Sequence, residues 1–120
     1  LEQDIKQCQA RYGKKVLLSL GGAGTILRLE TNLEALRFAN LLWALFGPPG
    51  NLNDQLRPFG SAVLDDFDLD ENVALPAHFD SLCSLLRANF ANDLSKDYFF
   101  SAAPQCNFPD ISIPMVYILQ

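Results

Sequence analysis

Hydrophobic and polar residues recur with helical spacing in three parts of the chain, residues 1–13, 32–46 and 77–91. The first segment places apolar or small residues on one face and is closed by Gly13, which favours a helix end there. The second begins at a Thr-Asn pair that can cap a helix and is stopped by the sequence Gly-Pro-Pro-Gly. The third follows Pro76, a residue suited to a first helical turn. Three helices are therefore predicted.

Short apolar runs between these segments predict strands over residues 16–21, 61–70 and 97–103. Strands that alternate with helices are typical of repeated βα units in a parallel sheet. We therefore expect three neighbouring parallel strands, with helices 32–46 and 77–91 packed on one side. Tandem βα units occur mainly in the open doubly wound sheet and in the closed eight-stranded barrel.

Composition indicates one soluble globular domain over residues 1–120, because 49% of the 120 residues are hydrophobic. The net charge of −5 would repel a polyanion, so nucleic acid is not an expected partner. No apolar run approaches the ~20 residues that a membrane span needs, so no membrane contact is expected. Residue 1 opens no signal-peptide pattern.

Three cysteines, Cys8, Cys83 and Cys106, cannot all pair with one another, and none has the CxxC spacing of a zinc or redox site. Cys83 lies on the apolar side of a predicted helix, which indicates a buried and unreactive thiol. His78 is the only histidine and is predicted to be an ordinary surface residue. No metal and no cofactor are expected.

The chemistry of parallel βα folds gathers at the carboxyl ends of the strands. Here those ends read SLGG, DLDEN and AAPQC. The glycine-rich stretch after the first strand has Leu27 where a dinucleotide fingerprint needs its third glycine. The acidic run lacks the glycine and the final glutamate of an EF-hand calcium loop. The carboxylates themselves therefore become the candidate chemistry.

Side chains in a strand alternate between faces, so Asp66, Asp68 and Asp70 share one face while Asp65 and Glu71 point to the other. Asp68 and Asp70 would form a stacked pair that can share a proton. Such a pair suits acid and base work on a polar substrate, because the charge of one raises the pKa of the other.

The sequence also resembles a known family. KKVLLSLGG is similar to the SxGG strand, and VLDDFDLDEN to the DxxDxDxE strand, of the family-18 glycoside hydrolases, the chitinases. SAAPQCNFPD resembles a segment of the plant and fungal class III chitinases. The resemblance implies an α/β fold, a (β/α)8 TIM barrel of about 250 residues, of which this chain would supply roughly strands 3 to 6 with their helices.

The same resemblance implies a substrate-assisted hydrolysis of β-1,4-linked N-acetylglucosamine, an exception to the two-carboxylate scheme. By position, Glu71 would be the acid, Asp70 would orient the acetamido group of the substrate, and Asp68 would couple to Asp70. No cofactor takes part. The substrate-binding positions that it implies are Asp65, Ser19, Gly21, Gly22 and Gln105.

The chain departs from the family at the acid position. Glu71 follows Asp70 directly, and Asn72 stands where the family has its glutamate. Alternation predicts that Glu71 faces away from the cleft unless the strand ends or bulges there. Asp66 replaces a glycine. A chitinase-like domain with weak or no activity is therefore expected, and a non-catalytic chitin-binding or lectin-like protein and a truncated gene product stay open as alternatives.

The implied partner is chitin or a chito-oligosaccharide, and the implied localisation is extracellular, since the family is secreted. In class III chitinases the cysteines matching Cys8 and Cys106 pair with partners outside this segment, so both would be unpaired here. Open strand edges in a partial barrel would also favour self-association.

Overall fold

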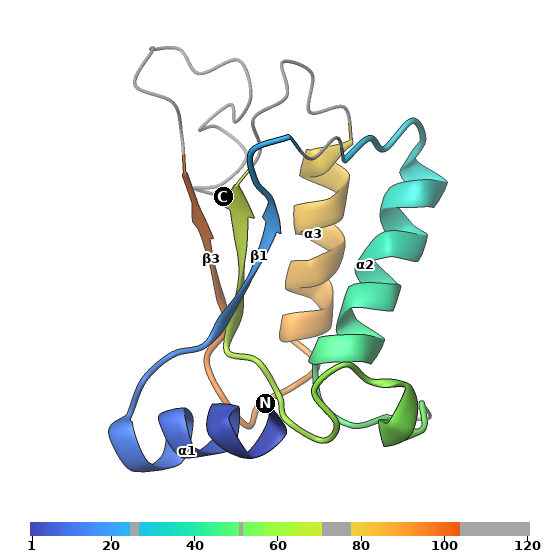
Figure 1. Cartoon of the computed structure of the whole chain (residues 1–120). Helices are drawn as coiled ribbons and strands as arrows, with labels where there is room; N and C mark the ends of the chain where they lie inside the picture. Colours follow the sequence, from blue (N-terminus) through green and yellow to red (C-terminus); the bar gives the residue numbers. More distant parts are fainter. Residues whose placement is uncertain (25–26, 51, 71–77, 104–120) are drawn as a thin grey trace.

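A computed structural model describes residues 1–24, 27–50, 52–70 and 78–103 (Figure 1). Helices and strands alternate along the chain. Their bounds are α1 Glu2–Tyr12, β1 Leu17–Gly21, α2 Asn32–Phe46, the short 3₁₀ helix η1 Asp54–Leu56, β2 Asp66–Asp70, α3 Phe79–Phe90 and β3 Phe99–Ala102.

The three strands form one parallel sheet in the order β1-β2-β3. Helices α2 and α3 lie side by side on one face of this sheet, while α1 lies near the ends where the strands begin (Figure 1). The predicted parallel strands and the placement of both helices on one side are therefore confirmed. No helix within the described ranges has the length and apolar character needed to cross a membrane.

The helix ends follow the local chemistry of the sequence. Gly13 ends α1 in the left-handed conformation with φ 58°, which glycine adopts without steric cost. Thr31 caps α2, because its side chain accepts a hydrogen bond from the Glu34 amide at 3.2 Å. His78 stands before α3 with φ 63°, so the described part of this helix starts at Phe79.

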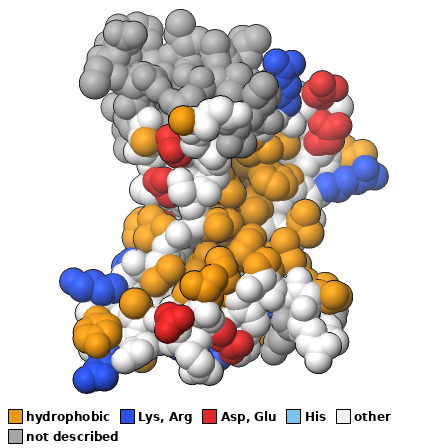
Figure 2. All heavy atoms as spheres, in the orientation of Figure 1, with side chains coloured by type: hydrophobic (Ala, Val, Ile, Leu, Met, Phe, Trp, Pro, Cys, Tyr) orange, Lys and Arg blue, Asp and Glu red, His pale blue; other side chains and the backbone are white. Residues whose placement is uncertain are grey.

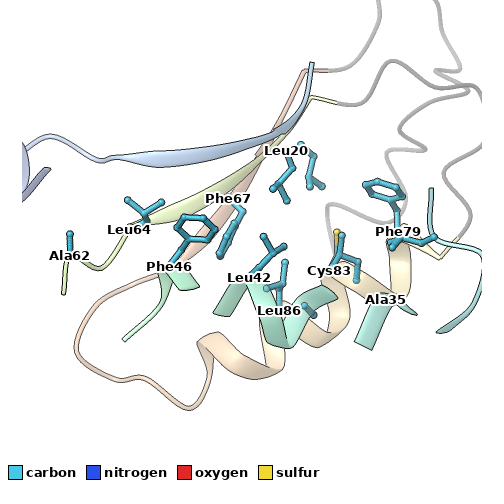
Figure 3. Close-up of a cluster of buried hydrophobic side chains, with 14 of the residues drawn as sticks. Leu20, Ala35, Leu42, Phe46, Ala62, Leu64, Phe67, Phe79, Cys83 and Leu86 are labelled. Atoms are coloured by element: carbon cyan, nitrogen blue, oxygen red, sulfur yellow. The ribbon is translucent and has the colours of Figure 1, made fainter. Parts of the chain in front are cut away.

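The core lies between the sheet and the two helices (Figure 3). Leu20, Phe67 and Leu69 project from the strands toward α2 and α3. The helices contribute their own apolar faces, Ala35, Ala39, Leu42 and Phe46 from α2 and Phe79, Leu82, Cys83 and Leu86 from α3. The predicted burial of Cys83 is confirmed, and burial raises the pKa of its thiol to about 11.

The second strand is shorter than the predicted range 61–70, since only its second half pairs with its neighbours. Residues 61–65 instead run beneath α2, where Ala62 and Leu64 are buried. Arg57 organises this segment. Its buried guanidinium donates hydrogen bonds to the carbonyls of Ala44 and Gly47 at the end of α2 and to that of Ala62. Backbone carbonyls at a helix end need such donors, so Arg57 holds this segment against the end of α2.

Candidate functional site

The carboxyl ends of the three strands meet at one edge of the sheet, as the parallel order requires. The register places Ser19 of β1 opposite Asp68 of β2, and Asp68 opposite Ser101 of β3. Since Phe67 and Leu69 enter the core, alternation puts Asp68 on the face away from the helices. The candidate site is therefore on the sheet face that α2 and α3 leave uncovered.

Asp68 is held between two hydroxyl groups. The Ser19 hydroxyl donates to one of its carboxylate oxygens at 2.8 Å, and the Ser101 hydroxyl donates to the other at 2.5 Å. Each contact comes from a different strand, so the sheet register fixes the direction of the carboxylate. A charged acceptor with hydroxyl donors on both sides is a strong and oriented arrangement. We call this set of three side chains the Ser-Asp-Ser row.

Asp70 lies one step further along the same face of β2, opposite Gly21 in the register. Residues two apart in a strand are separated by about 7 Å, so Asp68 and Asp70 line the same stretch of surface. The Gly22 amide donates to the Asp70 carbonyl at 2.7 Å. Gly21 and Gly22 have φ values of 112° and 97°, which side chains rarely adopt, so both glycines are needed for the turn beside the carboxylates.

Asp66 begins the same row of aspartates but is only 1% exposed. Within the described residues, no well-formed hydrogen bond reaches either of its carboxyl oxygens. The pKa of this carboxyl is raised to about 7, mainly because the group is buried. The nearby charges of Asp65 and Asp68 also raise this pKa, whereas the backbone amides of Phe67 and Phe99 lower it. The surroundings of Asp66 therefore disfavour the charged form of its carboxyl group.

Asp65 is placed differently, at the end of the sheet where the strands begin. Its carboxylate accepts hydrogen bonds from the Gln9 side chain and the Val16 amide, both at 2.8 Å, and from Lys96 at 3.1 Å. Burial opposes ionisation, but these donors together hold the pKa of Asp65 below its ordinary value. The contacts tie α1, β1 and the segment before β3 together, and a substrate-binding role for Asp65 stays a prediction.

Two predicted site residues, Glu71 and Gln105, lie outside the described residues, so their roles stay predictions. Ser101 is a site residue that the sequence analysis did not single out. Ser101 is recognised only from the register between β2 and β3, which places it opposite Asp68. Cys8 has no disulfide partner among the described residues, and Cys106 lies outside them.

The single histidine takes part in a helix junction. The Asn32 side-chain oxygen lies 2.7 Å from His78 Nδ1 and accepts a hydrogen bond from the Ser81 hydroxyl at 2.9 Å. These contacts join the starts of α2 and α3. In the described part of the chain, no group of three or more His, Cys, Asp or Glu side chains is arranged to hold a metal ion.

A parallel β/α sheet with an oriented carboxylate at the carboxyl ends of its strands defines a class of proteins that bind or transform polar substrates at that edge. The relatives that this sequence matches are chitinases. The chain is 44% identical over 113 residues to Chitinase 3 of Candida albicans, covering 94% of this chain and 20% of that protein. It is 39% identical over 117 residues to Endochitinase 3 of Metarhizium robertsii, covering 96% and 36%. No family model matches the sequence.

Solved structures agree with these relatives. The xylanase and α-amylase inhibitor protein of Scadoxus multiflorus superposes with a TM-score of 0.86 at 34% identity, covering 97% of this chain and 41% of that one. A chitinase of Ipomoea carnea superposes with a TM-score of 0.82 at 30% identity, covering 93% and 39%. A chitinase-like lectin of tamarind superposes with a TM-score of 0.63 at 27% identity, covering 92% and 38%.

Over most of its length the chain is similar to fungal chitinases and to plant chitinase-like proteins of the family-18 glycoside hydrolases. It spans about a fifth of the length of the Candida relative and about two fifths of the matched plant structures.

Proposed function

We propose that residues 1–120 form part of a (β/α)8 barrel, roughly its third to sixth strands, and that the sheet face opposite α2 and α3 binds chitin or chito-oligosaccharides. The parallel sheet with both helices on one face supports the barrel. Hydrophobic side chains also gather between β1 and α2 on the face shown in Figure 2. Further βα units would cover these side chains in a complete barrel.

The observation that carries the proposal is the Ser-Asp-Ser row. A carboxylate fixed by two hydroxyls is preorganised, so it can accept a hydrogen bond from a sugar without first losing freedom. Asp70, one step closer to the strand end, takes the role of orienting the acetamido group of the substrate. Asp68 then acts through Asp70, as the resemblance to the family implies.

Hydrolysis by this chain is expected to be weak or absent. Glu71 directly follows Asp70, so the acid is one position earlier than in the family motif. General acid catalysis typically contributes a factor of ~10²–10⁴ in rate. An incomplete barrel also offers fewer sugar contacts, and remote contacts help drive the distortion of the reacting ring.

A non-catalytic chitin-binding or lectin-like role is the second candidate. It is favoured by the altered spacing of the acidic motif, together with the similarity to a chitinase-like lectin. Both candidates place the sugar on the sheet face that carries Asp68 and Asp70, and they differ only in turnover. Secretion of the natural protein, and self-association of the isolated chain through its open strand edges, are further parts of the proposal.

The test combines turnover with binding. We expect the chain to bind chitotetraose in calorimetry, and Asp68→Asn to weaken the binding at least about tenfold, or 1.4 kcal/mol. Asp97→Asn, which changes an exposed carboxylate elsewhere, serves as the matched control. A chromogenic chitobioside should show little or no hydrolysis. Equal binding by the native chain and Asp68→Asn would overturn the proposal.

A further inference from the structure

A cavity lies near the end of the sheet at which the strands begin, away from the Ser-Asp-Ser row. It is bounded by the last turns of α2, the loop that follows α2, and the turn after α3, near the bottom of Figure 1. Its volume is about 360 Å³, which falls within the range of small-molecule sites. The lining includes Asn40, Trp43, Pro48, Asn92 and Asp93.

Trp43 gives this cavity a fixed aromatic wall. Its ring centroid lies 5.7 Å from that of Phe90 and 5.2 Å from that of Tyr98. A Cβ atom at Gly47 would come within 2.8 Å of the Trp43 ring, so a glycine is needed for the ring to lie where it does. The indole therefore needs no reorganisation to receive a ligand, which favours binding.

Two amide side chains provide unused hydrogen-bonding capacity. Asn40 and Asn92 are exposed, and their side chains make no hydrogen bond within the described part of the chain. Each offers donors and an acceptor at the cavity edge. Asp93 is already engaged, since it accepts from the Tyr98 hydroxyl at 2.6 Å and from the Ser95 amide at 2.9 Å. These donors fix the carboxylate and leave further lone pairs on it.

The residues that line the cavity indicate which class of ligand it would bind. A carboxylate and no lysine or arginine among the lining residues disfavour an anion. The amides and the carboxylate disfavour a purely apolar molecule, because it would leave their polar atoms without partners. A sugar ring fits both features, since its C–H face is apolar and its hydroxyl edge is polar.

We propose that this cavity is a second, non-catalytic site for a neutral pyranose sugar, with one ring face against Trp43 and its hydroxyl edge toward Asn40, Asn92 and Asp93. The site stands apart from the Ser-Asp-Ser row because it lies at the other end of the sheet. Binding there would anchor a neutral polysaccharide without occupying the proposed catalytic face.

Trp43 is the only tryptophan, so tryptophan fluorescence reports on the surroundings of this one side chain. Titration with chitotriose should give a saturable change in emission, and a parallel titration with cellotriose shows whether the N-acetyl group is required. The double variant Asn40→Ala/Asn92→Ala should weaken the apparent affinity at least about fivefold, since it removes two side chains that would hydrogen-bond the sugar. Far-UV circular dichroism checks that the variant is folded.

Two control variants separate this proposal from the chitin-binding face. Asp68→Asn and the exposed α3 variant Ser84→Ala should both leave the Trp43 titration unchanged. If neither sugar changes the emission, or if the double variant binds as the native chain does, the second site is wrong. A response abolished by Asp68→Asn would also overturn it, because the sugar would then be at the other end of the sheet. If calorimetry shows no binding that depends on Asp68, the proposed chitin-binding face is wrong, but a saturable Trp43 titration still supports the second site.

Discussion

Replacing Asp66 by asparagine should change how the stability of the chain depends on pH. The Asp66 carboxyl has a pKa raised to about 7 in the folded chain, mainly because it is buried, against an ordinary value of 3.8. In the unfolded chain this carboxyl loses its proton near its ordinary pKa. The folded state keeps the proton until about pH 7, so the free energy of unfolding falls as pH rises between these two values.

The size of the effect follows from the shift. A pKa change of one unit corresponds to 1.36 kcal/mol, so a shift of about 3 units gives a loss of about 4 kcal/mol above pH 7. Below about pH 4 the loss is absent. Asp65 has a lowered pKa, so its contribution to stability is lost only as pH falls through the acidic range and does not overlap with this loss.

Guanidinium unfolding of the native chain and of Asp66→Asn at pH 4, 5.5 and 8 measures the effect. The asparagine side chain would also lack a hydrogen-bond partner in this position. The unfolding free energy of Asp66→Asn at a single pH is therefore less informative than its dependence on pH. The difference in unfolding free energy between variant and native chain should grow by about 4 kcal/mol from pH 4 to pH 8. Asp97→Asn is the control and should follow the native trend. A constant difference across this range would refute the account of Asp66.

Three further results are expected. Arg57→Ala should lower the free energy of unfolding by about 3 kcal/mol or more, because Arg57 is only 4% exposed and its guanidinium donates hydrogen bonds to backbone carbonyls such as those of Gly47 and Ala62. Arg57→Lys should recover part of this stability in the same assay. In a chain extended to a whole barrel, inserting one apolar residue between Asp70 and Glu71 should raise chitobioside turnover by a factor of ~10² or more, and unchanged turnover would contradict the register account. Light scattering at high concentration should show self-association of the isolated chain, and a clean monomer would count against exposed strand edges.

The fold was predictable where local patterns were strong. Helix α2 begins and ends where the sequence predicted, because Thr31 caps it and glycine with two prolines follows it. The second strand was predicted too long. The apolar residues Ala62 and Leu64 are buried by the loop that Arg57 organises, and a buried loop cannot be distinguished from a strand by its apolar pattern.

Only the part of the site that lies within a single strand was predictable from the sequence. The shared face of Asp68 and Asp70 follows from the period of a strand. Ser101 could not be assigned to this face from the sequence, because its position depends on the register between β2 and β3. The burial of Asp66 is likewise a tertiary effect, since nothing in the local sequence shows that this aspartate lies beneath the surface.

The central claim is that a chitin oligomer binds along the Ser-Asp-Ser row. Nuclear magnetic resonance titration of isotope-labelled chain with chitotetraose tests it most directly, since each backbone amide reports separately. The account predicts saturable shifts at the amides of Ser19, Gly22, Asp68 and Ser101, and their loss in Asp68→Asn. Amides at these strand ends that stay unshifted at the highest sugar concentration, in a folded native chain, would contradict it.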